Sequence, residues 1–284
     1  MSDPIAVLAE FESRARRVET PCGDGMLVWR VWGPKQGDLP PLVLGHGAQG
    51  AWSHWVRNID ALAAHYTVIA PDLPGHGDSA MPAAVDHDTI SAAIAGGMRA
   101  LLGEGQQADF VGFSFGGAAF THFAVRYPEF ARRVVIVGTG GLDTPHGHTD
   151  FGRVGGLVGE ERRAAMKRNL LGMMLHHAET VDEMAMHLLM ANGRRGRLPV
   201  KDLVIPDRVV QVLPQLKVPL DAIWGEFDRP HPDPALQEAV LRRFQPEVDF
   251  RVIADAGHWA MYERAELFNA TLLDMLGQPP RLME

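Results

Sequence analysis

Short apolar runs rich in β-branched residues recur along this chain, and turn residues separate them. The runs expected to form strands are residues 26–32, 39–45, 66–72, 108–114, 132–138, 218–225 and 248–254. Helical patterns lie between several of them, at residues 88–102, 115–127 and 234–244. Strands joined through helices form right-handed βαβ units, which build a parallel sheet covered on both faces. We therefore predict an α/β fold with a mostly parallel central sheet flanked by helices.

One region departs from this alternation. Residues 146–205 contain no convincing strand pattern but two amphipathic helical segments, at about 159–176 and 180–193. Six of the thirteen methionines fall in this region. A single methionine is most simply a core residue, but a group of flexible thioethers suits a lid over an apolar site. We predict a core formed by residues 1–145 and 206–284, and a helical cap formed by residues 146–205.

Charge and cysteine content exclude several classes of partner. The 284-residue chain carries a net charge of −8, and its basic residues are scattered, which disfavours nucleic acid and anionic membranes as partners. A single cysteine, Cys22, excludes an internal disulfide, and the first twenty residues have no apolar segment typical of a signal peptide. We expect a cytoplasmic protein that acts on a small molecule, and we leave a homodimer open.

The segment Gly112-Phe113-Ser114-Phe115-Gly116 follows an apolar run and precedes a helical one. It matches G-x-S-x-G, a sharp strand-to-helix turn that exposes a nucleophilic serine. Residues two positions from the serine must be small, because larger side chains would collide across the turn. This context predicts Ser114 as the nucleophile.

A serine hydroxyl needs a base, and the base needs a carboxylate to orient it. Among thirteen histidines, His258 is the best candidate because it follows the last expected strand in a glycine-containing loop. Asp228, in WGEFD after the preceding strand, fits the chain order serine, acid, histidine. Asp143 is the alternative acid, and Glu226 is more simply a solvent-facing residue.

A tetrahedral oxyanion requires two backbone N–H donors. Phe115, directly after the serine, is predicted to supply one. Ala48, in the glycine-rich loop Gly45–Gly50, is predicted to supply the other, with Gln49 as the alternative. His46 in this loop is expected to shape the turn rather than act as the base.

The pocket beside the serine should be apolar. The residues expected to contact substrate are Phe113, Trp259, Met173, Met174 and Gln49. The two nearby tryptophans, Trp52 and Trp55, are more simply core residues. No residue pattern indicates a cofactor, and neither paired cysteines nor two histidines spaced on a helix indicate a metal site.

The segments HGAQG, APDLPGHGDS, GFSFGG, WGEFD and GHW resemble those of the α/β-hydrolase superfamily, in the same order over nearly the whole chain. This resemblance implies a helical cap inserted after the sixth strand. The segments at 51–59 and 257–269 further resemble the meta-cleavage product hydrolases, which cleave carbon–carbon bonds. Phe113 replaces the asparagine typical of those enzymes, and the loop at Gly45–Gly50 is shorter. Their substrate-binding cap arginine has only Arg194 and Arg195 as candidates here.

These observations favour a serine hydrolase that cleaves a small to medium apolar ester or lactone through an acyl-enzyme. The second hypothesis is carbon–carbon bond hydrolysis of an oxo-dienoate or diketone. The third is a ligand receptor that keeps the fold without turnover. The serine disfavours dehalogenase and epoxide hydrolase chemistry, because the superfamily uses an aspartate there for those reactions.

Overall fold

A computed structural model of the protein describes residues 3–33, 39–103 and 105–277. The strands are β1 (Arg16–Cys22), β2 (Gly25–Trp32), β3 (Leu42–Gly45), β4 (Val68–Asp72), β5 (Ala108–Phe113), β6 (Ala131–Val137), β7 (Leu220–Gly225) and β8 (Phe250–Ile253). The α-helices are α1 (Pro4–Arg14), α2 (Ile59–Ala63), α3 (His87–Leu102), α4 (Phe115–Arg126), α5 (Gly159–Asn169), α6 (Glu183–Gly193), α7 (Pro234–Arg242), α8 (Ala260–Glu263) and α9 (Ala265–Gly277).

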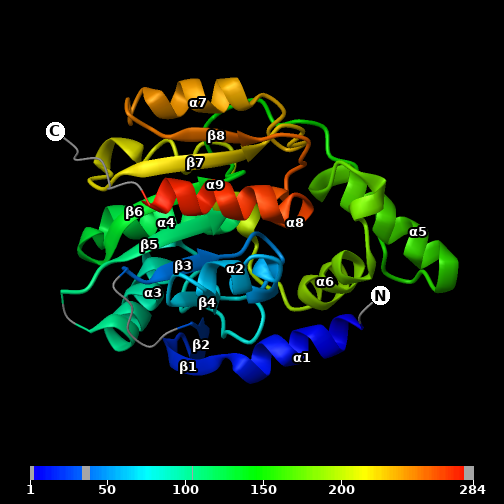
Figure 1. The fold of residues 1–284 in the computed structure, drawn as a ribbon, viewed down its shortest axis with the longest axis horizontal. Helices are drawn as coiled ribbons and strands as arrows, with labels where there is room; N and C mark the ends of the chain where they lie inside the picture. The colour runs from blue at the N-terminus through cyan, green and yellow to red at the C-terminus, as the bar shows by residue number, and fades with distance from the viewer. Residues whose placement is uncertain (1–2, 34–38, 104, 278–284) are drawn as a thin grey trace.

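Within these residues the strands form one eight-stranded sheet in the order β1-β2-β4-β3-β5-β6-β7-β8 (Figure 1). The first two strands pair antiparallel, as do β2 and β4, and every later pairing is parallel. The prediction of a mostly parallel central sheet is confirmed.

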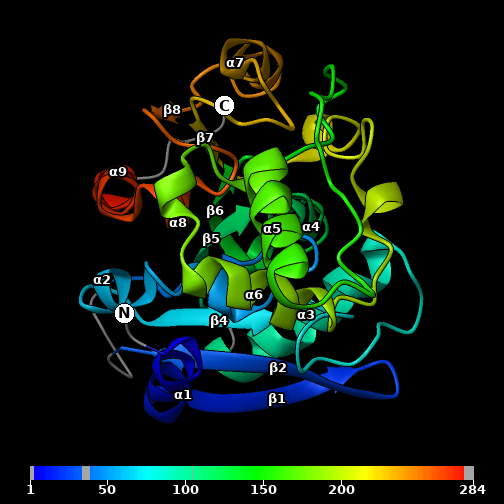
Figure 2. The same cartoon turned by 90° about the vertical axis from the view of Figure 1, so that its right-hand side faces the viewer.

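Helices cover both faces of the sheet, with α3 and α4 on one side and α2 and α9 on the other (Figure 2). Successive side chains of β6 point to opposite faces of the sheet, so this strand packs against both layers of helices. Val134 and Ile136 belong to the apolar cluster under α3 and α4, whereas Val135 and Val137 belong to the cluster under α9. A strand buried on both faces reads as a continuous apolar run, which is why β6 was recognisable in the sequence.

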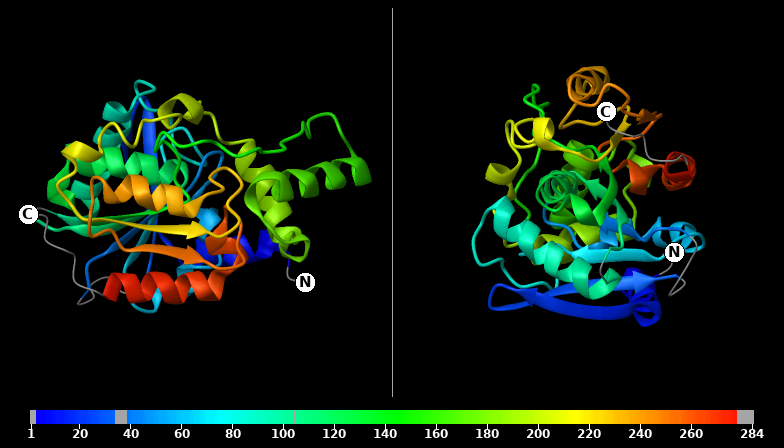
Figure 3. Two further views of the ribbon diagram at one scale, coloured as in Figure 1. Left: turned by 90° about the horizontal axis from the view of Figure 1, so that it is seen from above. Right: turned by 90° about the vertical axis from the view of Figure 1, so that its left-hand side faces the viewer.

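Helices α5 and α6 lie beyond the carboxyl ends of the parallel strands, apart from the layers that flank the sheet (Figures 1 and 3). Residues 146–205, all of them described, contain helices and turns but no strand. The boundaries of a separate cap domain stay a prediction. In the described part of the chain, no helix is both long and apolar enough to cross a membrane.

Two local differences from the expected elements have clear causes. Strand β1 lacks an apolar run because it is an edge strand that is mostly exposed, so the sequence did not reveal it. The helix expected over 159–176 ends at Asn169 and continues as a π-helical turn, Leu170–Met174. Gly172 in this turn packs against the carbonyl of Asp150, where a side chain would collide.

Two adjacent glycines in α3 provide a matched test of the packing under the sheet. A Cβ at Gly97 would overlap the ring of buried Trp29, whereas a Cβ at Gly96 would meet nothing within 4 Å. Gly97→Ala should therefore lower the free energy of unfolding by about 1–3 kcal/mol through overpacking. Gly96→Ala should raise it by about 0.5–1 kcal/mol through helix propensity. Urea unfolding of both variants measures this, and equal effects would contradict the packing of α3 against β2.

Candidate active site

Ser114 lies at the carboxyl end of β5, between the strand and α4. Its backbone has φ 50° and ψ −112°, a conformation that is costly for a residue with a Cβ. The Ser114 N–H donates to the carbonyl of Val137 at the end of β6, at 2.8 Å. The serine is thus held in a strained turn by the neighbouring strand, as the G-x-S-x-G motif requires.

The glycines around Ser114 allow three backbone segments to approach one another closely. A Cβ at Gly112 would overlap the backbone of Gly116, and a Cβ at Gly116 would lie 2.6 Å from the carbonyl oxygen of Gly45. A Cβ at Gly117 would overlap the hydroxyl of Thr139. The small residues are therefore required by contacts with β3 and with the loop after β6, as well as by the turn itself.

The structure brings Asp228 and His258 together. Asp228 Oδ2 is 2.8 Å from His258 Nδ1, and Asp228 Oδ1 accepts the His231 N–H at 2.9 Å. Asp228 and His258 are both buried. Burial alone would raise the pKa of the Asp228 carboxyl, but His258 and His231 together hold it well below its usual range. Asp228 is therefore ionised and able to hold the imidazole of His258 in one orientation.

The loop after β6 places this pair beside the serine turn. Gly138, with φ 51°, follows the residue that accepts the Ser114 N–H. A Cβ at Gly138 would lie 2.9 Å from Asp228 Oδ2 and 3.1 Å from His258 Nδ1. The ring of Phe113 lies 4.9 Å, between centroids, from the His258 ring. The turn of Ser114 and the pair Asp228 and His258 thus both lie against the segment that follows β6.

The other two candidate acids lie elsewhere. Asp143 is an exposed loop residue with φ 55°, and its N–H donates to the carbonyl of Pro206. Glu226 is also exposed, and its carboxylate accepts the N–H of Asp255 at 2.8 Å. Among the described contacts, Asp228 is the acid bonded to His258.

The two predicted oxyanion donors lie at the end of β3 and at the start of α4. Phe115 is the first residue of α4, so its N–H has no acceptor inside the helix. Ala48 lies in a turn closed by the Gly50 N–H donating to the Gly47 carbonyl, and Gln49 in this turn has φ 52°. The positive φ of Gln49 was not apparent from the sequence.

His46 supports this loop and is unsuited to act as a base. Its Nε2 accepts the N–H of Leu73 at 2.9 Å, so Nδ1 carries the proton and donates to the Gly47 carbonyl. Burial lowers the pKa of His46 to about 3. The imidazole is therefore a neutral link between the loops that follow β3 and β4.

A cavity of about 360 Å³ opens beside the loop Gly45–Gly50, which is called the oxyanion loop below. Its walls include five residues predicted to act in the site, namely Ala48, Gln49, Met173, Met174 and Trp259. Phe113, also predicted to contact substrate, is instead packed among the rings of His54 and His258. Two polar wall residues, His54 and Lys201, were missed, because nothing near them in the sequence signals a pocket.

Comparisons with known proteins fit this geometry. The alpha/beta hydrolase family matches residues 42–271. A 2-hydroxy-6-oxononadienedioate/2-hydroxy-6-oxononatrienedioate hydrolase from Paraburkholderia phymatum is 35% identical, over 82% of this chain and 84% of its own. This chain is an α/β hydrolase. The predicted resemblance to the superfamily and to the meta-cleavage product hydrolases is thereby confirmed.

Two further proteins are similar to this chain. A 2-hydroxy-6-oxo-6-phenylhexa-2,4-dienoate hydrolase from Burkholderia cepacia is 29% identical, over 93% of this chain and 97% of its own. The structure of a naproxen esterase from Bacillus subtilis shares the fold, with a TM-score of 0.76 and 21% identity over 97% of this chain and 99% of that one. These proteins are similar to this chain, which is an enzyme of the α/β-hydrolase family.

Glu263 links residues 146–205, which are called the cap region below, to the loop that carries His258. Its buried carboxylate accepts the N–H groups of His176 and His177 at 2.8–3.0 Å, the Gly257 N–H at 2.6 Å and the Thr180 hydroxyl at 2.8 Å. No local sequence pattern indicates this role, because the bonded residues are mostly more than eighty positions away. We infer that Glu263 fixes the backbone on the amino side of His258.

Glu263→Gln tests this link. The new NH₂ group would face N–H donors, so buried donors lose their acceptor at a cost of about 1–3 kcal/mol in the free energy of unfolding. The kcat of the hydrolase should also fall several-fold, because the base and the cavity wall both lose their anchor. Glu266→Gln, at an exposed position of α9, is the matched control for unfolding and kinetics. Identical behaviour of the two variants would contradict the proposed anchoring.

Buried histidines predict how the stability of the hydrolase depends on pH. Burial lowers the pKa of His46, His54 and His76 to about 3 each, against about 6.5 in an unfolded chain. Below pH 6.5 the unfolded chain binds protons that the folded chain does not, so stability falls as the pH falls. Each histidine lowers the free energy of unfolding by at most about 2 kcal/mol when the pH falls from 7 to 5. Urea unfolding at both pH values measures this loss.

His76→Asn isolates one member of this group. The asparagine amide can still donate to the Pro74 carbonyl, as His76 Nδ1 does at 3.1 Å, but it does not titrate. The variant should therefore show a smaller loss between pH 7 and pH 5 than the parent enzyme. A stability that stays constant over this range would show that these histidines are not held neutral by burial.

Proposed function

We propose that this hydrolase cleaves small to medium, largely apolar carboxylic esters or lactones through an acyl-enzyme on Ser114. The observation that carries this proposal is the cavity of about 360 Å³ that lies between the oxyanion loop and the cap region. Ala48 forms one wall of it, and Trp259, the neighbour of His258, forms another. Most of the remaining wall is apolar, with methionine and leucine side chains prominent. We infer that this cavity holds the acyl chain of the substrate, with the carbonyl at its Ala48 end.

The mechanism follows from the roles of the assembled groups. His258 removes the proton of Ser114 as the hydroxyl attacks the carbonyl, and ionised Asp228 stabilises the imidazolium that forms. The N–H groups of Phe115 and Ala48 stabilise the oxyanion, and losing one such donor typically costs about 3 kcal/mol. His258 then protonates the leaving group and activates the water that releases the acid.

Carbon–carbon bond hydrolysis is the second candidate, and the relatives favour it. Several relatives near 30% identity are named as hydrolases of oxo-dienoates or oxo-dienedioates. The walls of the cavity favour the ester, because they are mostly apolar. They offer few polar side chains to a charged substrate, namely Gln49, His54 and Lys201. A buried polar substrate needs a partner for each of its polar groups. Phe113 also replaces the asparagine that those enzymes typically place before the nucleophile.

A panel of p-nitrophenyl esters from acetate to octanoate, assayed beside a ring-fission dienoate, distinguishes the two reactions. We expect ester hydrolysis to dominate, with kcat/KM highest for acyl chains that fill the cavity. Rapid turnover of the dienoate with negligible ester cleavage would replace the ester proposal with the carbon–carbon one.

Substitution of the predicted nucleophile tests the mechanism for either substrate. Ser114→Ala should lower kcat by at least about 10³-fold, and Asp228→Asn by about 10³- to 10⁴-fold through loss of the correct tautomer. A fluorophosphonate probe should label the parent enzyme and Ser13→Ala, an exposed control position, but not Ser114→Ala. A folded parent enzyme that resists labelling would favour binding without turnover.

A further inference from the structure

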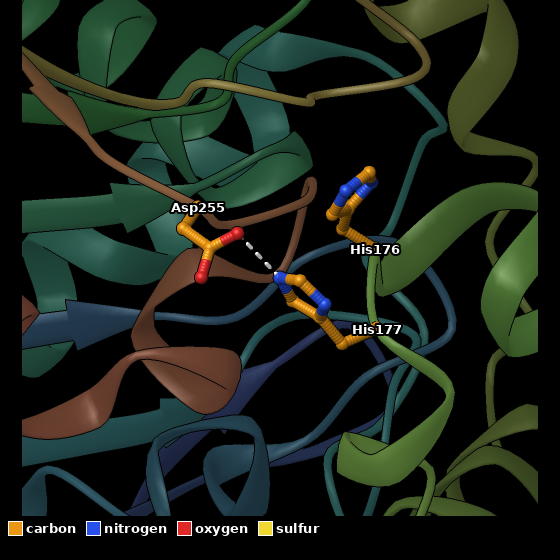
Figure 4. A group of neighbouring side chains, drawn as sticks. All are labelled: His176, His177 and Asp255. Carbon is orange, nitrogen blue, oxygen red and sulfur yellow. Dashed lines mark hydrogen bonds and ion pairs between the residues drawn. The ribbon is translucent and has the colours of Figure 1, made fainter.

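His177 of the cap region faces Asp255 of the core, and His176 lies next to them (Figure 4). Each residue offers one ligand atom, these atoms lie within 4.8 Å of one another, and all three residues are half-buried. His177 Nε2 lies 2.7 Å from Asp255 Oδ1. We propose that these three residues form a site for a divalent transition-metal ion of the zinc class, which joins the cap region to the core.

The donor atoms define the class of ion. Two imidazole nitrogens and one carboxylate oxygen suit zinc and its neighbours, whereas calcium and magnesium prefer oxygen ligands alone. Ligands at about 2.0–2.2 Å from a tetrahedral ion lie roughly 3.3 Å apart. Side-chain rotations that shorten the separations by an ångström or so would therefore complete three positions, and water would supply the fourth.

The backbones that carry these ligands are already fixed. The Glu263 carboxylate holds the N–H groups of His176 and His177. Asp255 has φ 59°, and its N–H donates to Glu226. Arg264 donates to the Asp255 carbonyl and pairs with Oδ2, so it orients the carboxylate while Oδ1 faces His177. Partners that orient ligands in this way strengthen a metal site.

Charge around the group also favours a cation. Glu179 Oε1 lies 3.6 Å from His177 Nδ1, and Glu226 and Glu263 bond to the backbones of the ligand residues. With Asp255 these make four carboxylates, against the single guanidinium of Arg264 that bonds to Asp255. The ring of His176 stacks on Phe227, with centroids 3.9 Å apart, and this contact does not engage its nitrogens.

A bound ion would restrain the loop that carries His258. Asp255 precedes His258 by three residues, and the Trp259 N–H donates to the Met174 carbonyl at 2.7 Å. Met174 also forms part of the cavity wall. An ion held by both segments therefore resists their separation. This inference is independent of which bond the hydrolase cleaves.

Titration of the metal-free enzyme with Zn²⁺ and with Co²⁺ tests the site, through calorimetry for zinc and visible absorption for cobalt. We expect one equivalent to bind, with at least about tenfold weaker affinity in His177→Gln and in Asp255→Asn. His65→Gln, at an exposed position of the core, should bind as the parent enzyme does. Zinc should raise the Tm of the parent enzyme and leave that of His177→Gln nearly unchanged.

The buried group Asp228, His231 and His258 also brings three donors together and must be distinguished. The same titration in His231→Gln separates the two positions, because this variant alters the buried group alone. Retained binding in His231→Gln together with loss in His177→Gln supports the proposed site. Loss in His231→Gln with full binding in His177→Gln, or no binding to the parent enzyme, overturns it.

Discussion

The close approach of backbone segments around Ser114 is the constraint on which the rest of the site depends. Strands β3, β5 and β6 end side by side, and Gly45, Gly112 and Gly116 allow their loops to touch. The turn after β5 can then place a serine in a strained conformation, because the Val137 carbonyl and the helix that follows hold it there. Side chains at these glycines would push the loops apart. The strain therefore depends on packing between distant segments, and the serine alone does not create it.

A second constraint is the burial of the polar groups near the cavity, because burial decides which of them can carry charge. Asp228 uses one oxygen for the His258 ring and the other for the His231 N–H, which leaves the imidazole little freedom to turn. His46 is neutral and makes one hydrogen bond through each ring nitrogen. The contrast shows how similar burial yields different chemistry. A histidine beside a buried carboxylate can accept a proton in the reaction, whereas a histidine bonded only to neutral backbone groups is kept uncharged.

The sequence predicted the parts of the molecule that depend on local pattern. The buried strands were visible as apolar runs. Ser114, Asp228 and His258 were predicted as the catalytic residues because each follows such a run in a loop. Edge strand β1 was missed, because an exposed edge has no apolar pattern. His54, Lys201 and Glu263 were missed for a different reason. Their surroundings are created by segments far away in the chain, and no local residue pattern encodes such contacts.

Met174 and Glu263 bear on substrate choice, because both connect residues 146–205 to the loop that carries His258. Met174 lines the cavity and also accepts the N–H of Trp259, so a substrate that displaces the methionine also disturbs the neighbour of His258. Glu263 bonds the N–H of His176 and that of Gly257, so it ties the same region to the residue on the other side of His258. A substrate that fits the cavity leaves the base in place, whereas one that does not fit moves it. Selectivity in such an arrangement arises in kcat as well as in KM, since the wall that recognises the substrate also positions the base.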